Sequence, residues 1–216
     1  MPYSIYSLIT YLLCFTLCSC SNSSTPNSNQ TKKLQAVFVN PYSEGTYEHF
    51  VSSREYPHTY SIYLDPELMK QLNRSNTSIE IDLQRQRGYL LYDKDWVAMD
   101  YPISTGQSSF PTPRGTFKVL QKIRSDKRSN LYGKIYDANG NVVHGDADID
   151  QHKIPPGGKF VGAPMKYWMR ITWSGIGMHQ GKVPRYPASH GCIRTYHKAV
   201  PIVYDHVNIG TPVVVR

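Results

Sequence analysis

Cysteine is nearly absent from this chain after its apolar first twenty residues. Of four cysteines in 216 residues, Cys14, Cys18 and Cys20 lie close to the start, and only Cys192 follows them. A single thiol cannot form an internal disulfide, so Cys192 is either a small buried apolar residue or a reactive group. His190 lies two residues before it and Arg194 two residues after it. Because such groups lower the pKa of a thiol, we expect Cys192 to form the nucleophilic thiolate.

Several other features are missing, and each absence excludes a class of protein. No run of five or more like charges occurs, although the net charge is +8, so we expect no nucleic-acid partner. The scattered basic residues instead favour an anionic neighbourhood such as membrane headgroups or an acidic wall polymer. No Gly-rich phosphate loop with Lys and Ser or Thr occurs, so no nucleotide cofactor is expected. The hydrophobic content of 40% is enough for a folded core.

The first residues are apolar but short. Residues 8–18 fall below the roughly twenty residues that a bilayer span requires, and no charged side chain precedes Lys32. Leu17-Cys18-Ser19-Cys20 resembles a bacterial lipobox. This resemblance implies a lipoprotein-type signal peptide over residues 1–19, diacylglycerol on Cys20 and a membrane contact through that lipid anchor. The alternative is an ordinary leader that is cleaved nearby, with Cys20 incidental.

Composition divides the rest of the chain. Residues 20–33 are rich in Ser, Asn and Thr and are interpreted as a flexible tether, whereas residues 34–77 form an N-terminal extension of unknown role. Within the extension, Asp65 and Pro66 predict the start of a helix over residues 65–72. Residues 144–152 are rich in His and Asp but lack the Gly and Glu of a calcium loop, so we expect a solvated acidic loop there. A second helix is expected over 197–207, and strands over 79–83, 89–92, 96–103, 116–120, 167–173 and 212–215.

Many short strands punctuated by Gly and Pro indicate a mostly β domain. Several stretches also occur in a characteristic order: Ile79-Glu80-Ile81-Asp82-Leu83, Ser104-Thr105-Gly106, Thr112-Pro113-Arg114-Gly115-Thr116-Phe117, Gly177-Met178-His179, Ser189-His190-Gly191-Cys192-Ile193-Arg194 and Gly210-Thr211-Pro212-Val213. In order and spacing, residues 78–216 resemble the L,D-transpeptidase catalytic domain of bacterial cell-wall enzymes. This resemblance implies a β-sandwich or barrel-like domain with short helices and an active-site cleft. The interval between His179 and Cys192 is shorter than in long-looped members, and Arg194 stands where some members have Asn.

The resemblance implies a cysteine-dependent acyltransferase that needs no cofactor. Cys192 would attack a peptidoglycan stem tetrapeptide at the bond between meso-diaminopimelate and D-Ala, form a thioester and pass the acyl group to an amine. An L,D-carboxypeptidase, with water as acceptor, would use the same residues. The implied location is the periplasmic side of the cell envelope, and Ser21 after the lipobox cysteine favours the outer membrane.

Two histidines are candidates for the base. His190 lies at i−2 to Cys192, so in an extended segment their side chains stand about 7 Å apart along the strand, too far for a direct hydrogen bond. His179 comes from a separate segment, and the resemblance assigns proton transfer to it. A backbone carbonyl would then orient the His179 ring. His190 is left as a pocket-lining or a structural residue.

The remaining candidates surround the thiol. Gly191 permits close backbone approach, so the N–H groups of Gly191 and Cys192 are expected to stabilise an oxyanion. Ser189 is expected to stabilise the turn through its hydroxyl. Arg194 either binds a stem carboxylate through a two-pronged contact or forms a surface ion pair. Tyr167 and Trp168 are expected to pack in the core rather than flank the substrate.

Other readings of these residues are weaker. Cys192, His179 and His190 could form a three-ligand zinc site, but the surrounding motifs match a metal-free family, so no metal is expected. A catalytically silent wall-binding module would not need both His179 and Cys192. A papain-like protease is not supported, because its Cys motif is absent and the histidine precedes the cysteine.

Overall fold

The computed structural model describes residues 38–216, and Phe38–Arg216 form one compact unit. The signal peptide expected over residues 1–19, the tether expected over 20–33 and the lipidation expected at Cys20 lie outside the described residues. No helix among residues 38–216 has both the length and the apolar character needed to cross a membrane.

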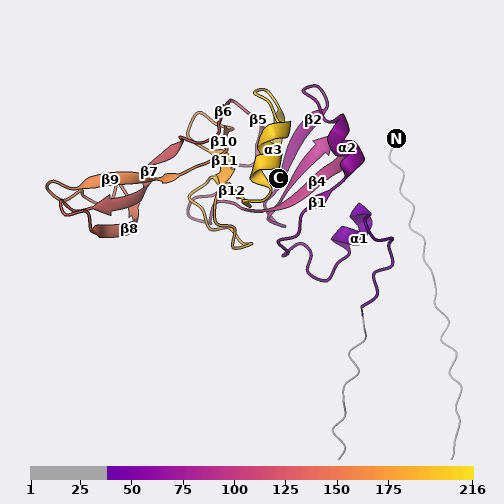
Figure 1. Ribbon diagram of the computed structural model, residues 1–216, viewed down its shortest axis with the longest axis horizontal. Helices are drawn as coiled ribbons and strands as arrows, with labels where there is room; N and C mark the ends of the chain where they lie inside the picture. Colours follow the sequence, from indigo (N-terminus) through magenta and orange to yellow (C-terminus); the bar gives the residue numbers. More distant parts are fainter. Residues whose placement is uncertain (1–37) are drawn as a thin grey trace, which may run out of the picture. The chain divides into compact units, whose positions relative to one another are not determined.

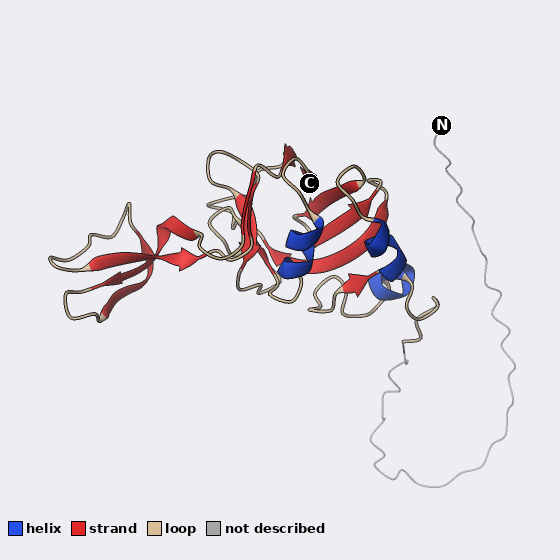
Figure 2. Cartoon of the chain, turned by 45° about the horizontal axis from the view of Figure 1, so that its top comes forward, coloured by secondary structure: helices blue, strands red, loops and turns tan. Residues whose placement is uncertain are grey.

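The fold is mostly β, and its main feature is a curled ten-stranded sheet (Figures 1 and 2). Its strands follow the order β5-β13-β2-β3-β4-β12-β11-β10-β6, and β1 pairs with β4 outside this path. The strands are β1 Tyr63–Leu64, β2 Thr77–Asp82, β3 Arg87–Tyr92, β4 Trp96–Ser104, β5 Gly115–Lys118, β6 Gln121–Ile123, β10 Trp168–Arg170, β11 Gly177–Gln180, β12 Ile193–Thr195 and β13 Pro212–Val215.

A separate three-stranded sheet has the order β8-β7-β9 (Figure 1). It consists of β7 (Arg128–Tyr136), β8 (Val142–Asp148) and β9 (Lys159–Pro164). The expectation of a solvated loop over residues 144–152 was therefore wrong in its first half, because residues 144–148 pair with β7 as part of β8. The polar side chains that suggested a loop are compatible with a strand of which most residues are exposed.

Three short helices complete the fold: α1 Tyr47–Val51, α2 Pro66–Gln71 and α3 Val200–His206. Helix α2 begins where the sequence predicted, because the Asp65 side chain accepts hydrogen bonds from the backbone N–H groups of Glu67 and Leu68. The predicted helix over 197–207 begins later, at Val200, after a turn.

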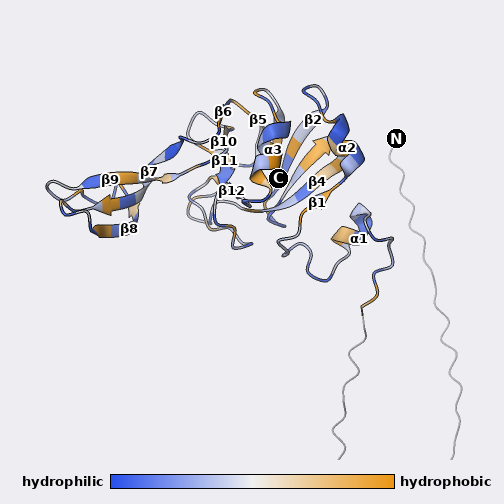
Figure 3. Cartoon of the chain, viewed as in Figure 1, coloured by the Kyte–Doolittle hydropathy of each residue, from blue (hydrophilic) through white to orange (hydrophobic). Residues whose placement is uncertain are grey.

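The core lies between the main sheet and α3. Val200, Val203 and Tyr204 of α3 belong to one buried cluster together with residues of the strands, and Figure 3 shows hydrophobic residues on this helix and on β2 and β4. In strands β10, β11 and β12, the residues Met169, Met178 and Ile193 are fully buried in the same cluster. Because side chains alternate along a strand, the neighbours of these three residues face the opposite side of the sheet.

One predicted strand is shorter than expected. The pattern over residues 167–173 predicted a continuous strand, but only Trp168–Arg170 pair as β10. Tyr167 has a φ of +57°, a left-handed conformation that interrupts an extended strand, and residues 172–175 form a turn that ends at Gly175 with a φ of +107°.

Residues 38–64, here called the N-terminal segment, pack against the domain within the same compact unit. The segment contains α1 and ends in β1, where Tyr63 pairs with Asp100 and Leu64 with Met99 of β4. This part of the predicted N-terminal extension is therefore joined to the main sheet by backbone pairing.

Candidate active site

Cys192 lies in the turn that leads into β12, and its side chain is half-buried. The preceding Gly191 has a φ of +104°, a region that side chains other than glycine rarely adopt. A Cβ atom at this position would also lie 2.8 Å from Cδ1 of Ile176. The backbone conformation therefore favours glycine immediately before the thiol, whereas the terminal methyl of Ile176 could move away from an added Cβ.

Two motifs that are weak by themselves meet at this turn. Oγ1 of Thr112 donates a hydrogen bond of 2.8 Å to the carbonyl of Gly191 and accepts one of 2.9 Å from the backbone N–H of Gly106. A Cβ atom at Gly106 would lie 2.9 Å from Cα of Gly191. The Ser-Thr-Gly and Thr-Pro-x-Gly stretches therefore fix the backbone of the cysteine turn, a role that sequence reasoning did not assign to them.

Ser189 stabilises the same turn through its hydroxyl. Its Oγ donates to the carbonyl of Cys192 at 2.5 Å and accepts a hydrogen bond of 3.1 Å from the backbone N–H of Gly191. The Gly191 N–H is therefore already engaged and does not point freely toward a reacting carbonyl. The expectation that this group is one of two oxyanion donors does not hold in this geometry, because it closes the turn instead.

His179 is buried in β11, next to the strand that follows Cys192. Its Nδ1 lies 2.8 Å from the carbonyl oxygen of Gln180. A carbonyl oxygen only accepts hydrogen bonds, so the proton of a neutral ring resides on Nδ1, and Nε2 is left as a proton acceptor. Burial lowers the pKa of His179 to about 4, aided by the positive charge of Arg194 and opposed by the hydrogen bond to Gln180. The ring is therefore neutral near pH 7.

Strand register brings the candidate residues onto one face of the sheet. In the parallel pair β11–β12, Met178 is opposite Ile193 and His179 is opposite Arg194. Since Met178 and Ile193 point into the core, His179 and Arg194 face the other side of the sheet. Cys192 precedes β12 in its turn, and it lines the same cavity as His179 and Arg194.

Strand β10 adds two further residues to this face. Met169 pairs with Met178 and Arg170 with Gly177, which places Trp168 beside His179, with their ring centroids 6.2 Å apart. Trp168 is only 1% exposed, as expected for a core residue, yet it also lines the site cavity. Arg170 was not predicted as a site residue, although its alternation with Met169 within the predicted strand could have shown that it shares a face with Trp168.

The environment of the Cys192 thiol differs from the expectation. Burial raises the pKa of Cys192, and this effect exceeds the opposing effects of the Gly177 backbone hydrogen bond and of the charges of Arg194, Lys127 and Arg170. The sulfur also lies 3.7 Å from the carbonyl of Gly175, which accepts the S–H of a protonated thiol. The expectation of a thiolate at rest was therefore wrong, because desolvation outweighs the neighbouring cations.

His190 contacts aromatic residues from outside the strands that contain His179 and Trp168. Its ring stacks on Tyr132 of β7 at a centroid distance of 4.0 Å and contacts the edge of Phe110 at 4.9 Å. It therefore lines the site between two aromatic rings. Tyr132 comes from the separate small sheet, and no sequence signal connected it with the cysteine motif.

These residues surround a cavity of about 630 Å³. Its charged lining consists of Lys127, Arg170, Lys182 and Arg194, and no carboxylate among the described residues contributes to it. Arg194 forms no ion pair with an acidic side chain within residues 38–216, which argues against the surface ion pair considered for it. A cavity with this charge attracts an anionic ligand and supports the other reading of Arg194.

A metal centre finds no support in the described part of the chain. Residues 38–216 contain no group of three or more His, Cys, Asp and Glu side chains arranged to hold an ion. In particular, His190 is turned toward Tyr132 and Phe110, so the zinc site considered for Cys192, His179 and His190 does not form.

The chain matches known proteins in the region that contains this site. A family model described as the L,D-transpeptidase catalytic domain matches residues 76–215. The probable L,D-transpeptidase 3 of Mycobacterium tuberculosis is 31% identical over 121 residues, which cover 53% of this chain and 38% of that protein. This chain therefore aligns with well under half of the length of that relative.

Solved structures are similar to part of the chain. An L,D-transpeptidase from Mycobacterium smegmatis has a TM-score of 0.48 and 24% identity, covering 65% of this chain and 58% of its own. A mutant of an Enterococcus faecium L,D-transpeptidase has a TM-score of 0.46 and 28% identity, covering 66% of this chain and 50% of its own. The family model covers well over half of the sequence and includes both His179 and Cys192, so the chain belongs to the L,D-transpeptidase catalytic domain family.

Proposed function

We propose that this protein is a peptidoglycan L,D-transpeptidase in which Cys192 is the nucleophile and His179 the general base. The observation that carries the proposal is that both side chains line the same cavity, with Nδ1 of His179 held by the Gln180 carbonyl. Covalent catalysis commonly combines a nucleophile, a base and a third group that orients the base. Family membership and the cationic cavity add support, because the stem peptides of peptidoglycan contain carboxylates.

Proton transfer accompanies nucleophilic attack in this proposal. The pKa of Cys192 is raised and that of His179 is lowered to about 4, so both groups are neutral at rest. The thiol proton moves to Nε2 of His179 as the sulfur bonds to the carbonyl carbon of the diaminopimelate–D-Ala bond. The resulting oxyanion is stabilised by the backbone N–H of Cys192 and by the charges of Arg170 and Lys127. The imidazolium then protonates the departing D-Ala amine and leaves a thioester on Cys192.

The second half of the reaction reverses these roles. An amine of a neighbouring stem attacks the thioester carbonyl and gives its proton to Nε2 of His179. The carbon–sulfur bond breaks, the sulfur takes the proton back, and a new peptide bond links the two stems. No external energy source is required, because the thioester conserves the energy of the cleaved bond. Arg194 lies beside His179 on the same face and is proposed to hold a carboxylate of the substrate.

Two alternatives remain beside this assignment. In an L,D-carboxypeptidase, water would replace the acceptor amine and the product would be a trimmed tripeptide. In a silent wall-binding module, neither reaction would occur. The proposed location is the cell envelope, through the lipid anchor at Cys20 that the sequence suggests.

The deciding experiment is incubation of the purified protein with disaccharide-tetrapeptides, followed by identification of the products by mass. A cross-linked dimer with loss of one D-Ala supports the transpeptidase, and a trimmed tripeptide without cross-link supports the carboxypeptidase. The Cys192→Ala variant is the matched control. Turnover by that variant, or no product from a folded wild-type protein, would contradict the proposal.

A further inference from the structure

A single loop connects the two proposed catalytic residues. Residues 181–188, here called the connecting loop, begin after β11, which contains His179, and end before the turn that contains Cys192. The strand pairing of β11 and the hydrogen bonds of the Cys192 turn hold the two residues from outside the loop. The contacts that hold the loop add to these and therefore contribute to the geometry of the proposed reaction.

The N-terminal segment supplies some of these contacts. The hydroxyl of Tyr60 donates a hydrogen bond of 2.8 Å to the carbonyl of Val183, and Nη1 of Arg185 donates one of 2.6 Å to the carbonyl of His58. The Arg185 guanidinium also lies 4.9 Å from the centroid of the Tyr60 ring. The Tyr60 side chain of the N-terminal segment and the Arg185 side chain of the connecting loop therefore join these two parts of the chain.

Arg185 has an unusual backbone conformation that needs such support. Its φ is +71°, in the left-handed region that favours glycine. Pro184 precedes it and Pro187 follows it, so the chain around it has few alternative conformations. The contacts with His58 and Tyr60 hold the arginine side chain in place and stabilise this strained part of the loop.

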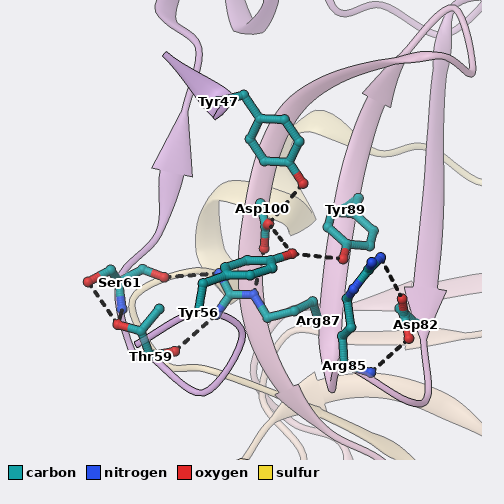
Figure 4. A network of polar contacts seen from close by, with 9 residues as sticks. All are labelled: Tyr47, Tyr56, Thr59, Ser61, Asp82, Arg85, Arg87, Tyr89 and Asp100. Atoms are coloured by element: carbon teal, nitrogen blue, oxygen red, sulfur yellow. Dashed lines mark hydrogen bonds and ion pairs between the residues drawn. The ribbon is translucent and has the colours of Figure 1, made fainter. Parts of the chain in front are cut away.

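Tyr60 is itself held from both sides by one buried residue. Arg87 of β3 donates hydrogen bonds of 3.0 Å to the carbonyl of Thr59 and 3.1 Å to the carbonyl of Ser61. Figure 4 shows this guanidinium between the two residues that flank Tyr60 and the carboxylate of Asp100. Because Arg87 is fully buried, the backbone at Tyr60 is fixed by the interior of the domain and not only by surface contacts.

The same network also holds two tyrosines of the segment. Asp100 of β4 accepts a hydrogen bond from Nε of Arg87 at 2.6 Å and hydrogen bonds from the hydroxyls of Tyr47 and Tyr56, each at 3.1 Å (Figure 4). The Tyr56 hydroxyl also contacts that of Tyr89 at 3.1 Å. A chain of contacts thus runs from the core through Arg87 and Tyr60 to the connecting loop.

Both ends of the connecting loop are held by the matched family domain. Near Cys192, the backbone N–H groups of Ala188 and Ser189 donate to the carbonyl of Thr105, and near His179 the N–H of Gly181 donates to the carbonyl of Thr195. The middle of the loop has contacts from two sources. Ser104 of the matched domain donates to the carbonyl of Tyr186, whereas the contacts of Val183 and Arg185 come from residues 58–60, which precede the family match that starts at residue 76.

We propose that the N-terminal segment braces the connecting loop, and that Tyr60 and Arg185 are positioning residues for the Cys192–His179 pair. The inference rests on the proposed function, because it takes Cys192 and His179 as the reacting pair. Neither Tyr60 nor Arg185 lines the cavity around Cys192, so they act through the loop and not through contact with the substrate. Loss of the Tyr60 or Arg185 contact should reduce proton transfer between Cys192 and His179 more than it reduces substrate affinity.

The test measures alkylation of Cys192 by iodoacetamide as a function of pH, because this readout requires no wall substrate. Tyr60→Phe removes the hydroxyl from an exposed ring and should leave the melting temperature nearly unchanged. We expect alkylation near neutral pH to slow by about three- to tenfold, the factor that corresponds to an ordinary hydrogen bond. The pH profile should shift toward that of His179→Gln, which lacks the base. Arg185→Gln tests the second contact in the same way.

Tyr42→Phe is the matched control, because Tyr42 is an exposed tyrosine of the same segment whose hydroxyl makes no hydrogen bond to the described residues. Turnover of disaccharide-tetrapeptides should show the same pattern, with a lower kcat and a similar KM for Tyr60→Phe. If Tyr60→Phe and Arg185→Gln both fold and both keep the alkylation profile of the wild type, the proposed role of the N-terminal segment is wrong. A wild-type protein that is alkylated but releases no product would instead count against the proposed function alone.

Discussion

The hydroxyl of Thr112 donates a hydrogen bond of 2.8 Å to the carbonyl of Gly191, the residue directly before Cys192. The two residues are far apart in the sequence, and Thr112 is only 5% exposed. This contact, with that of Gly106 to the same hydroxyl, ties the thiol turn to the loop after β4. This pair of hydrogen bonds explains why a threonine stands at position 112, in a stretch whose pattern predicted only a turn.

Thr112→Val should therefore impair both stability and reaction. The substitution keeps the shape of the side chain but leaves the Gly191 carbonyl and the Gly106 N–H without this partner, which should lower the free energy of unfolding by about 1–3 kcal/mol. Turnover should fall in protein that remains folded, because the Cys192 turn loses a support. Urea unfolding and product analysis measure the two effects.

Thr116→Val, at an exposed position of β5, is the control and should change neither stability nor turnover. Equal stability and turnover of the two variants would refute this role of Thr112.

The positions of several strands and of the two proposed reacting residues carry local signals in the sequence. Alternation indicated β2 and β4, and the Asp65–Pro66 pair indicated the start of α2. The cysteine motif and the upstream histidine pointed in the same way to Cys192 and His179, which the structure brings to one cavity. Strands β7, β8 and β9 were missed because their sequence is polar, contains glycine and has no clear period of two. Strands β1, β6, β11 and β12 were also not predicted, because runs of two to four residues are too short to show a period.

Long-range contacts could not be predicted. The stacking of Tyr132 on His190 and the hydrogen bond from Tyr60 to Val183 each join segments that no local pattern relates. The protonation state of Cys192 was mispredicted for a similar reason. Neighbouring cations were visible in the sequence, whereas the burial that raises the thiol pKa depends on the complete fold.

The stability of the protein should depend on pH through His179. Its pKa is lowered from 6.5 to about 4 in the folded state, so between these values the unfolded chain binds a proton that the folded protein does not. Stability should therefore fall as the pH decreases from about 6.5 to about 4, by about 3 kcal/mol in total for this group. Unfolding curves at several pH values measure the change, and the difference from His179→Gln isolates the histidine. A variant with the same pH dependence as the wild type would contradict the shifted pKa.

A carbapenem should acylate Cys192. The strained lactam carbonyl is a reactive acyl donor, and a thiol activated by His179 should open the ring and retain the drug as a thioester. The intact mass of the folded protein should then increase by one adduct, and peptide mapping should locate the adduct at Cys192. Cys192→Ala should keep its circular dichroism spectrum and remain unmodified. Absence of an adduct on the folded wild type would weigh against the proposed chemistry.

Cys20→Ala should release the protein from membranes if the sequence Leu17-Cys18-Ser19-Cys20 functions as a lipobox. Cys20 is the first residue of the predicted tether, so its substitution leaves the matched domain unchanged and activity in solution should be retained. Fractionation of bacteria that express each form, with immunodetection in the membrane and soluble fractions, measures the effect. Cys18→Ala is the neighbouring control and should remain membrane-bound. Equal membrane association of wild type and Cys20→Ala would refute lipidation at this residue.

Asp100→Asn should destabilise the protein strongly, because the Arg87–Asp100 pair is completely buried. The two side chains are 0% exposed, and Nε of Arg87 lies 2.6 Å from Oδ1 of Asp100. Removal of the carboxylate charge leaves the guanidinium buried without a counter-charge, which should lower the free energy of unfolding by about 3–5 kcal/mol. Glu67→Gln removes a charge from an ion pair with Lys70 at 2.8 Å, but both side chains are exposed there.

For that surface pair the expected loss is below about 1 kcal/mol, because water and salt screen its charges. The comparison of the two variants by urea unfolding thus separates the effect of burial from that of ion pairing itself. Equal stability of Asp100→Asn and Glu67→Gln would contradict this expectation. The network of Arg87, Tyr47 and Tyr56 would then not be what holds the N-terminal segment against the domain. The hydrogen bonds from Arg87 to the carbonyls beside Tyr60 would then have to persist without the ion pair.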